Sequence, residues 1–148
     1  MKRIVIAIDG SAGSREALET GLAIARGSGA IATLAYVRPG PPRLLGDPFY
    51  QRVLSEELGR ARAALADAEA LVAEAGVQSE TEILEGRPAE RILELARARA
   101  ADLIVVGSRD RGAIAVTLLG SVSTEIVNRA DLPVLVAKQR SRARHIAA

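Results

Sequence analysis

The sequence predicts a single α/β domain in which a parallel β-sheet carries helices on both faces. Short runs of β-branched residues alternate along the chain with longer segments of helical periodicity, and this alternation is typical of such folds. Hydrophobic residues make up 49% of the chain but aromatic residues only 2%. The core is therefore aliphatic, as it is in parallel strands covered by helices. A length of 148 residues suits one domain.

The first half of the chain is expected to contain two strands and two helices. Residues 2–8 form a β-branched run, and the helical segment that follows has either Ser11 or Ser14 as its N-cap and is stopped by the glycines at 27–29. Residues 30–37 form the second expected strand. Residues 38–48 are rich in proline and glycine and therefore predict a loop. A continuous apolar stripe from Leu54 to Ala75 then predicts a long helix that ends at Gly76.

The second half predicts three strands and two helices. Residues 77–84 alternate between polar and apolar types, which indicates an edge strand, and a helix follows with Pro88 near its start. Residues 102–106 are apolar after Asp102 and predict a central strand. A helix over about 120–130 and a strand over 133–138 complete the domain, which spans residues 1–138. Residues 139–148 are expected to form a flexible basic tail.

Composition excludes several classes of function. The chain has no cysteine, so disulfides and thiolate metal sites are absent. The N-terminal apolar run is too short for a signal peptide, and no stretch approaches the roughly 18 apolar residues of a membrane span. We therefore expect a cytoplasmic protein with no membrane partner. The scarcity of aromatic residues makes nucleic-acid binding an unfavoured role, although the basic tail leaves a contact with an anionic partner as an alternative.

The carboxyl ends of the first and fourth strands are the expected binding site. These two strands are the most apolar, which predicts that they are neighbours at the centre of the sheet, and open α/β sheets bind ligands beyond the strand ends where the strand order reverses. Asp9 follows the first strand, and a turn beginning at Gly107 follows the fourth. A carboxylate that accepts hydrogen bonds from sugar or base, opposite backbone N–H groups that donate to phosphate, suits a nucleotide.

Other chemistry has little support in the sequence. There is no Walker A motif, and the one histidine, His145, lies in the tail, so no Ser-His-Asp set can form in the body of the fold. A glycine turn before a helix is also common as plain structure. Ser121 and Ser123 are equally suited to capping the helix that they begin.

Four segments together resemble the universal stress protein family. They are IVIAIDGSAGSREAL, LAYVRP, EGRPAERILELARARAADLIVVGSR and LLGSVSTEIVNRADLPVLV, and the resemblance extends from residue 2 to about residue 138. It implies a Rossmann-like fold with five parallel strands in the order 3-2-1-4-5. It also implies a homodimer through the last strand, with an edge formed by Pro133, Val134, Leu135 and Val136. One branch of this family binds ATP through the motif G-x2-G-x9-G-[ST], and another branch lacks the motif and does not bind ATP.

The resemblance also implies the positions of the binding residues. Asp9 matches an acid near the adenosine, and Val37 matches a position whose backbone borders the adenine. Gly107 and Gly120 match the first and last glycines of the motif, and Ser121 and Ser123 match two hydroxyl positions. The expected nucleotide-binding set is therefore Asp9, Val37, Gly107, Ser108, Arg109, Gly120, Ser121, Val122 and Ser123.

The chain departs from the motif at Asp110, which stands where the middle glycine belongs, and Gly112 lies too close to Gly120 to replace it. A carboxylate about 4 Å from a phosphate charge costs on the order of 4 kcal/mol at an effective dielectric constant near 20. Arg109 and Arg111 could offset this repulsion, and a Mg²⁺ ion held by Asp110 could bridge it to the phosphates.

We therefore expect a stress-response regulatory protein that binds an adenine nucleotide (ATP, ADP or AMP), with or without Mg²⁺, and does not turn it over efficiently. Two alternatives remain open. The chain could be a dimeric interaction module that has lost nucleotide binding through Asp110, or it could be a slow ATP hydrolase.

Overall fold

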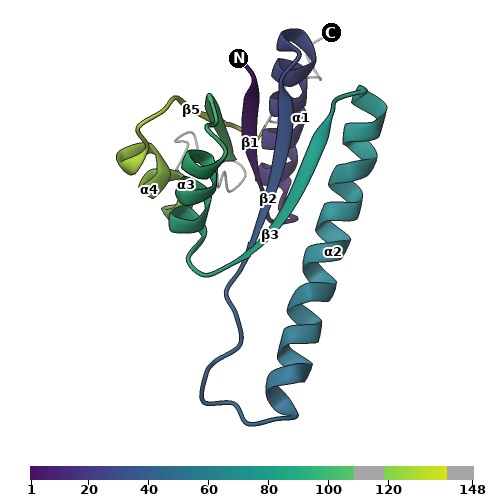
Figure 1. The fold of residues 1–148 in the computed structure, drawn as a ribbon, viewed down its shortest axis with the longest axis vertical. Helices are drawn as coiled ribbons and strands as arrows, with labels where there is room; N and C mark the ends of the chain where they lie inside the picture. Colours follow the sequence, from purple (N-terminus) through teal and green to yellow (C-terminus); the bar gives the residue numbers. More distant parts are fainter. Residues whose placement is uncertain (109–118, 140–148) are drawn as a thin grey trace, which may run out of the picture.

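The computed structural model describes residues 1–108 and 119–139 and confirms the expected α/β class (Figure 1). The strands are β1 (Arg3–Ile8), β2 (Ile31–Arg38), β3 (Ser79–Glu85), β4 (Leu103–Gly107) and β5 (Val134–Ala137). The helices are α1 (Ala12–Ser28), α2 (Phe49–Ala75), α3 (Pro88–Ala98) and α4 (Ser121–Arg129). Residues 140–148, most of the expected tail, lie outside the described part.

All five strands are parallel and follow the order β3-β2-β1-β4-β5, as expected. The central strand β1 pairs with both β2 and β4, and Ile4 lies between Ala32 and Leu103. The prediction of β3 as an edge strand is confirmed, and β5 forms the opposite edge. The chain leaves β1 toward β2 and returns on the other side to β4, so the strand order reverses between β1 and β4.

Two helical layers cover the sheet, one on each face (Figure 1). Alternate side chains of a strand point to opposite faces, so β1 contributes to two cores. Ile6 packs with Leu22 and Leu65 beneath α1 and α2. Val5 packs with Ile92 and Ile126 beneath α3 and α4.

The boundaries of the elements differ from the expected ones by one or two residues at most ends. Ser11 is the N-cap of α1, because its side-chain oxygen accepts the N–H of Ser14 at 3.1 Å. The expectation that residues 27–29 stop this helix is confirmed, because Ser28 is its last residue. The helix ends at Gly29, whose φ of 71° is a left-handed conformation that glycine adopts readily.

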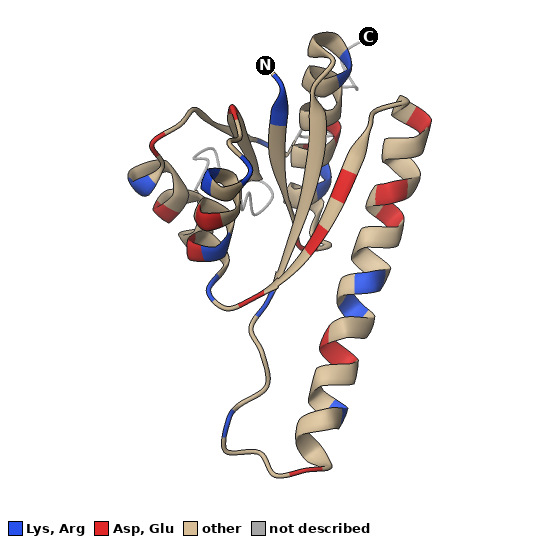
Figure 2. Cartoon of the chain, in the orientation of Figure 1, with Lys and Arg blue, Asp and Glu red and all other residues tan. Residues whose placement is uncertain are grey.

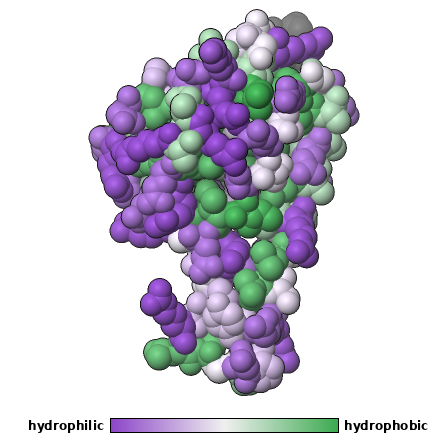
Figure 3. Space-filling view, in the orientation of Figure 1, coloured by the Kyte–Doolittle hydropathy of each residue, from purple (hydrophilic) through white to green (hydrophobic). Residues whose placement is uncertain are grey.

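Helix α2 is much longer than the strands that it covers. Its 27 residues span about 40 Å, so its N-terminal part projects beyond the carboxyl edge of the sheet (Figure 1). Arg38, the last residue of β2, joins this edge to α2 through Glu57 at 3.2 Å and to β3 through Glu85 at 2.7 Å. At the end of this projection, Leu44 of the loop and Phe49 at the start of α2 are exposed. Figure 3 shows apolar surface there.

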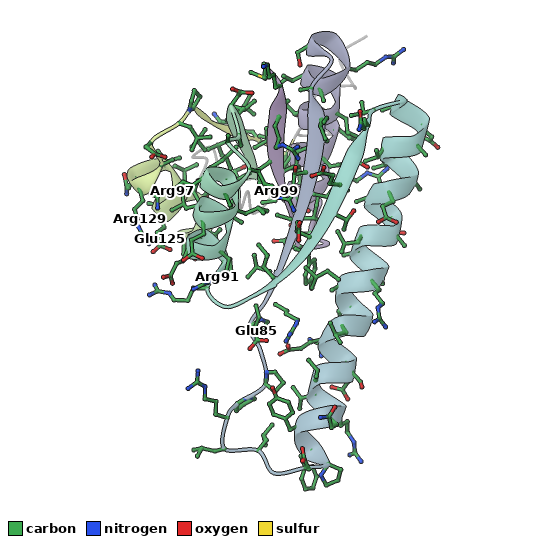
Figure 4. All side chains as sticks on the ribbon, viewed as in Figure 1. Glu85, Arg91, Arg97, Arg99, Glu125 and Arg129 are labelled. Atoms are coloured by element: carbon green, nitrogen blue, oxygen red, sulfur yellow. The ribbon has the colours of Figure 1, made fainter. Side chains whose placement is uncertain are left out.

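Ion pairs cover the part of the β3 surface that α3 does not reach. Arg99, which follows α3, extends toward β3 and pairs with Glu80 at 3.2 Å and with Glu82 (Figure 4). Arg3 of β1 also pairs with Glu80, at 2.5 Å, and donates to the hydroxyl of Thr33. None of the helices within the described ranges combines the length and apolar character that a membrane span requires.

Candidate functional site

A cavity of about 170 Å³ opens at the carboxyl ends of β1 and β4, on the face that α3 and α4 cover. It lies at the reversal of strand order, where open α/β sheets place their ligands. One half of its wall is polar and is made by chain turns and helix N-termini. The other half is apolar and is made by the sheet and α3.

Two glycines allow α1 to reach this cavity. A Cβ on Gly13 would lie 2.5 Å from the backbone oxygen of Ser108, and a Cβ on Gly107 would collide with the backbone of Gly13. Side chains at these positions would therefore push α1 away from β4. Their absence brings the first turn of α1 against the end of β4, so that both line the same cavity.

Asp9 is the only charged side chain among the described residues that line the cavity. Its Oδ1 accepts the N–H of Ser11 at 2.8 Å, and its own N–H donates to the hydroxyl of Ser14 at 3.0 Å. These bonds hold the carboxylate at the start of α1. Within the described residues Oδ2 makes no hydrogen bond, so it is suited to accept one from a ligand hydroxyl or amine.

Three helices begin at the cavity. Ser11, Pro88 and Gly120 stand at the starts of α1, α3 and α4, and each lines the wall. A helix N-terminus carries roughly half a positive charge and several N–H groups without helical partners. Among the described residues no side chain caps α3 or α4, so their first N–H groups are suited to bind an anion.

Ser108 adds a hydroxyl to the polar half. Ser108 is only 3% exposed, and its Oγ makes no hydrogen bond within the described residues. Buried hydroxyls are nearly always paired in native proteins. Because Ser108 lines the cavity, its hydroxyl is available to a ligand there. Ser123 differs, since its hydroxyl already donates to the carbonyl of Gly120 at 3.0 Å.

The apolar lining residues come mainly from the sheet and α3, and we call this part of the cavity the trough. Ala7 and Ala35 are paired across β1 and β2 and form its floor, because their side chains are small. Val37, Ile92 and Val106 stand around them. A flat ring could lie on this floor with its faces in contact with aliphatic groups.

The structure brings most of the predicted binding residues to this one cavity. The predicted residues that line it are Asp9, Val37, Gly107, Ser108, Gly120, Val122 and Ser123. Ser121 is exposed at the start of α4 and is not among the lining residues. Arg109, Asp110, Arg111 and Gly112 lie outside the described residues. In the described part of the chain no three acidic or histidine side chains form a group that could hold a metal ion.

Sequence reasoning missed the floor and the α3 side of the cavity. Ala7 and Ala35 lie two residues before Asp9 and Val37, so strand alternation alone could have placed them on the same face. Pro88 and Ile92 belong to a helix whose position over the sheet depends on tertiary packing. No local sequence pattern predicts that these two residues line the cavity.

Fold and cavity together define an α/β protein of the Rossmann-like class with a ligand site at the switch point of its sheet. The chain belongs to the universal stress protein family, because residues 1–138 match the model of that family. A universal stress protein of Thermus aquaticus is 39% identical to it, over 93% of this chain and 98% of the relative.

Two solved structures extend this likeness. A universal stress protein in complex with cAMP is 28% identical, with a TM-score of 0.70 and coverage of 94% of this chain and 98% of that one. The universal stress protein of Archaeoglobus fulgidus in complex with dAMP is 25% identical, with a TM-score of 0.74 and coverage of 93% and 98%.

Proposed function

We propose that this protein binds an adenine nucleotide in the cavity at the ends of β1 and β4 and acts as a regulatory protein of the stress response. The observation that carries the proposal is the division of one cavity into an alanine-floored trough and a polar half made by three helix starts. The base would lie in the trough. The phosphate would lie at the helix starts, where backbone N–H groups favour anions.

Two further features support this orientation. Asp9 lines the cavity, and its Oδ2, which makes no hydrogen bond within the described residues, can accept hydrogen bonds from the sugar. The hydroxyl of Ser108 has no partner among the described residues, lies in the polar half and can donate to a phosphate oxygen. The relatives in complex with cAMP and dAMP support a nucleotide with an adenine base and one phosphate.

We propose binding without efficient turnover. General acid–base catalysis needs a titratable group placed at the reacting atoms. Among the described lining residues the only such group is Asp9, which the proposal places at the sugar.

ATP and Mg²⁺ are the finer part of the proposal. Asp110 replaces the middle glycine of the motif that the ATP-binding branch uses, so we propose that the triphosphate binds less tightly than the monophosphate. Replacement of Asp110 by glycine should then tighten ATP binding and change AMP binding much less. If this substitution weakens ATP binding in Mg²⁺, Asp110 is a ligand of the metal.

Isothermal titration calorimetry with AMP, ADP and ATP, with and without Mg²⁺, tests the proposal. We expect the wild-type protein to bind AMP and the Asp9→Ala variant to bind it at least tenfold more weakly. Asp131→Ala is the matched control, since Asp131 is exposed in the turn before β5. Absence of heat with every nucleotide would refute the proposal in favour of the interaction module. Phosphate release that Asp9→Ala abolishes would favour the slow hydrolase.

We further propose a homodimer through β5. This strand is an edge of the sheet, and Val134, Leu135 and Val136 are only half-buried. Val127 nearby on α4 is also exposed. A bare apolar edge favours pairing with a second copy across a two-fold axis.

Light scattering after size exclusion at micromolar concentration tests the dimer. Leu135→Glu or Val134→Lys should break the β5 contact and lower the mass in solution, because a charge would be buried at that contact. Ile83→Glu on the other edge strand, β3, is the matched control and should leave the mass unchanged. A wild-type mass of one chain would rule out the β5 dimer.

A further inference from the structure

Helix α2 presents a face that no described residue covers. Opposite its buried stripe, five exposed small residues recur at spacings of four and three: Gly59, Ala63, Ala66, Ala70 and Ala73. A glycine inside a helix costs about 0.5–1 kcal/mol relative to alanine. A Cβ on Gly59 would meet no atom within 4 Å among the described residues, so their packing gives no reason for the glycine.

Between residues 59 and 74 the charges beside this face are separated into two blocks, and the exposed Glu56 precedes them by one turn. Arg60 and Arg62 lie near the middle of α2, and Asp67, Glu69 and Glu74 follow toward its C-terminal end, as the blue and red segments of Figure 2 show. A solvated helix is stabilised when opposite charges alternate at a spacing of four. Here the blocks do not pair with each other.

Within the described residues, the charged side chains of these two blocks make few ion pairs. Arg60 reaches Glu56 only at 4.0 Å, and Glu69 accepts a hydrogen bond from the hydroxyl of Thr81. Neither Arg62 nor Asp67 makes an ion pair with any residue that the structure describes. An occupant of this face would therefore need acidic groups opposite the arginines and basic groups opposite the acids.

We propose that the occupant is a second copy of this chain, with its α2 antiparallel to the first. A two-fold axis that passes between residues 64 and 65 brings Gly59 opposite Ala70 of the second copy and Ala63 opposite Ala66. The same axis sets the basic block of each helix beside the acidic block of the other. Arg60 then faces Asp67 on one flank of the contact, and Arg62 faces Glu69 on the other flank.

A single two-fold axis brings the small residues into contact and sets opposite charges beside each other. The small residues allow the helix axes to approach to about 8 Å, the short end of the usual range. Each ion pair forms twice, as a two-fold contact requires. A parallel arrangement would instead place arginine beside arginine and acid beside acid.

This contact is separate from the β5 edge and from the cavity. Helix α2 covers the β2–β3 side of the sheet, whereas β5 forms the opposite edge. Both contacts can therefore operate in one assembly of four or more chains. Nucleotide is not needed for the α2 contact, so failure of the nucleotide proposal would leave this inference standing.

Cross-linking through introduced cysteines tests the antiparallel register, since the chain has no cysteine of its own. Oxidation of a mixture of the Gly59→Cys and Ala70→Cys variants should give a disulfide-linked dimer at least tenfold faster than either variant alone. A disulfide requires Cα atoms about 4.4–6.8 Å apart, and the register brings only unlike positions together.

The exposed site Gly27 on α1 provides the collision control, as a mixture of Gly27→Cys and Gly59→Cys. If the mixture of Gly59→Cys and Ala70→Cys reacts no faster than this control, the inference is wrong. If each variant cross-links fastest with itself, the helices are parallel and the proposed register is wrong.

Charge exchange tests the pairing itself. In a Leu135→Glu background, which removes the β5 contact, Arg60→Glu or Asp67→Arg should each raise the dissociation constant of the dimer at least tenfold in sedimentation equilibrium. The double variant should restore it to within about threefold, because the exchanged charges again face each other. A double variant as weak as the single ones would overturn the proposal, as would single variants that associate like their background.

Discussion

Replacement of Gly13 by alanine should destabilise the protein and damage its cavity. In most helices this change is favourable, because alanine has the higher helix propensity by about 1 kcal/mol at interior positions. At Gly13 the new Cβ would lie 2.5 Å from the backbone oxygen of Ser108. An ordinary contact needs about 3.4 Å or more, so α1 and the end of β4 must separate by close to 1 Å.

The clash should exceed the gain in helix propensity. Overpacking in a tight interior typically costs about 1–3 kcal/mol, and neither partner here is a flexible side chain. The gain is also smaller than its interior value, because Gly13 is the second residue of α1. We expect a net loss of about 1–2 kcal/mol, which lowers the melting temperature of a domain of this size by about 2–8 °C.

Urea unfolding followed by circular dichroism measures this loss. Gly27→Ala is the matched control, since Gly27 also lies in α1 but a Cβ there would meet nothing within 4 Å. The control should be neutral or more stable than the wild type by up to about 1 kcal/mol. If Gly13→Ala were as stable as Gly27→Ala, the close approach of α1 to β4 would be refuted. AMP affinity should fall only in Gly13→Ala, because only that site lines the cavity.

Two other predictions concern charged groups. The N–H groups of Lys2 and Arg3 donate to the carboxylate of Asp102 at 2.6 and 3.0 Å and lower its pKa below the ordinary 3.8; its stabilising effect is therefore present above pH 3.8 and lost as the pH falls through the lowered value. Asp102→Asn should be less stable than the wild type at pH 7, with a difference that shrinks below about pH 4 in denaturant titrations, and an equal difference at pH 2 and pH 7 would contradict this. Glu57→Gln should cost on the order of 1–3 kcal/mol in urea unfolding, because the mostly buried Arg38 then keeps only Glu85; a cost no larger than that of Glu19→Gln, which breaks an exposed pair, would show that the buried pair is not stabilising.

Much of the fold could be predicted because local signals and global topology agree. The apolar run after Asp102 and the alternation before Gly86 distinguish a central strand from an edge strand, and both predictions are confirmed. Element ends were less accurate. Residues 27–29 predict the end of α1 but not which residue ends it. Gly27 lies in the last turn, since glycine is compatible with helical angles, and Gly29 has the left-handed conformation.

Sequence predicted only those site residues that directly end or follow a strand. Asp9 and Gly107 end the two central strands, so the rule for parallel sheets places them together. The trough depends on Ile92 of α3, whose position is set by packing against β2 and β1 rather than by nearby sequence. The hydroxyl of Ser108 points to a ligand because it is buried without a described partner, and the sequence does not reveal that burial.

The convergence of helix starts on the cavity is a property of the topology. Each helix that follows a parallel strand begins at the carboxyl edge of the sheet, so α1, α3 and α4 all deliver N–H groups to that edge. Helix α2 is the exception, because a loop of ten residues separates it from β2 and its first turns project past the sheet. The ion pair of Arg38 with Glu57 shows that the edge lies level with the third turn of α2. The start of α2 is thus too far away to serve the cavity, and its length instead provides an exposed face on the outside of the domain.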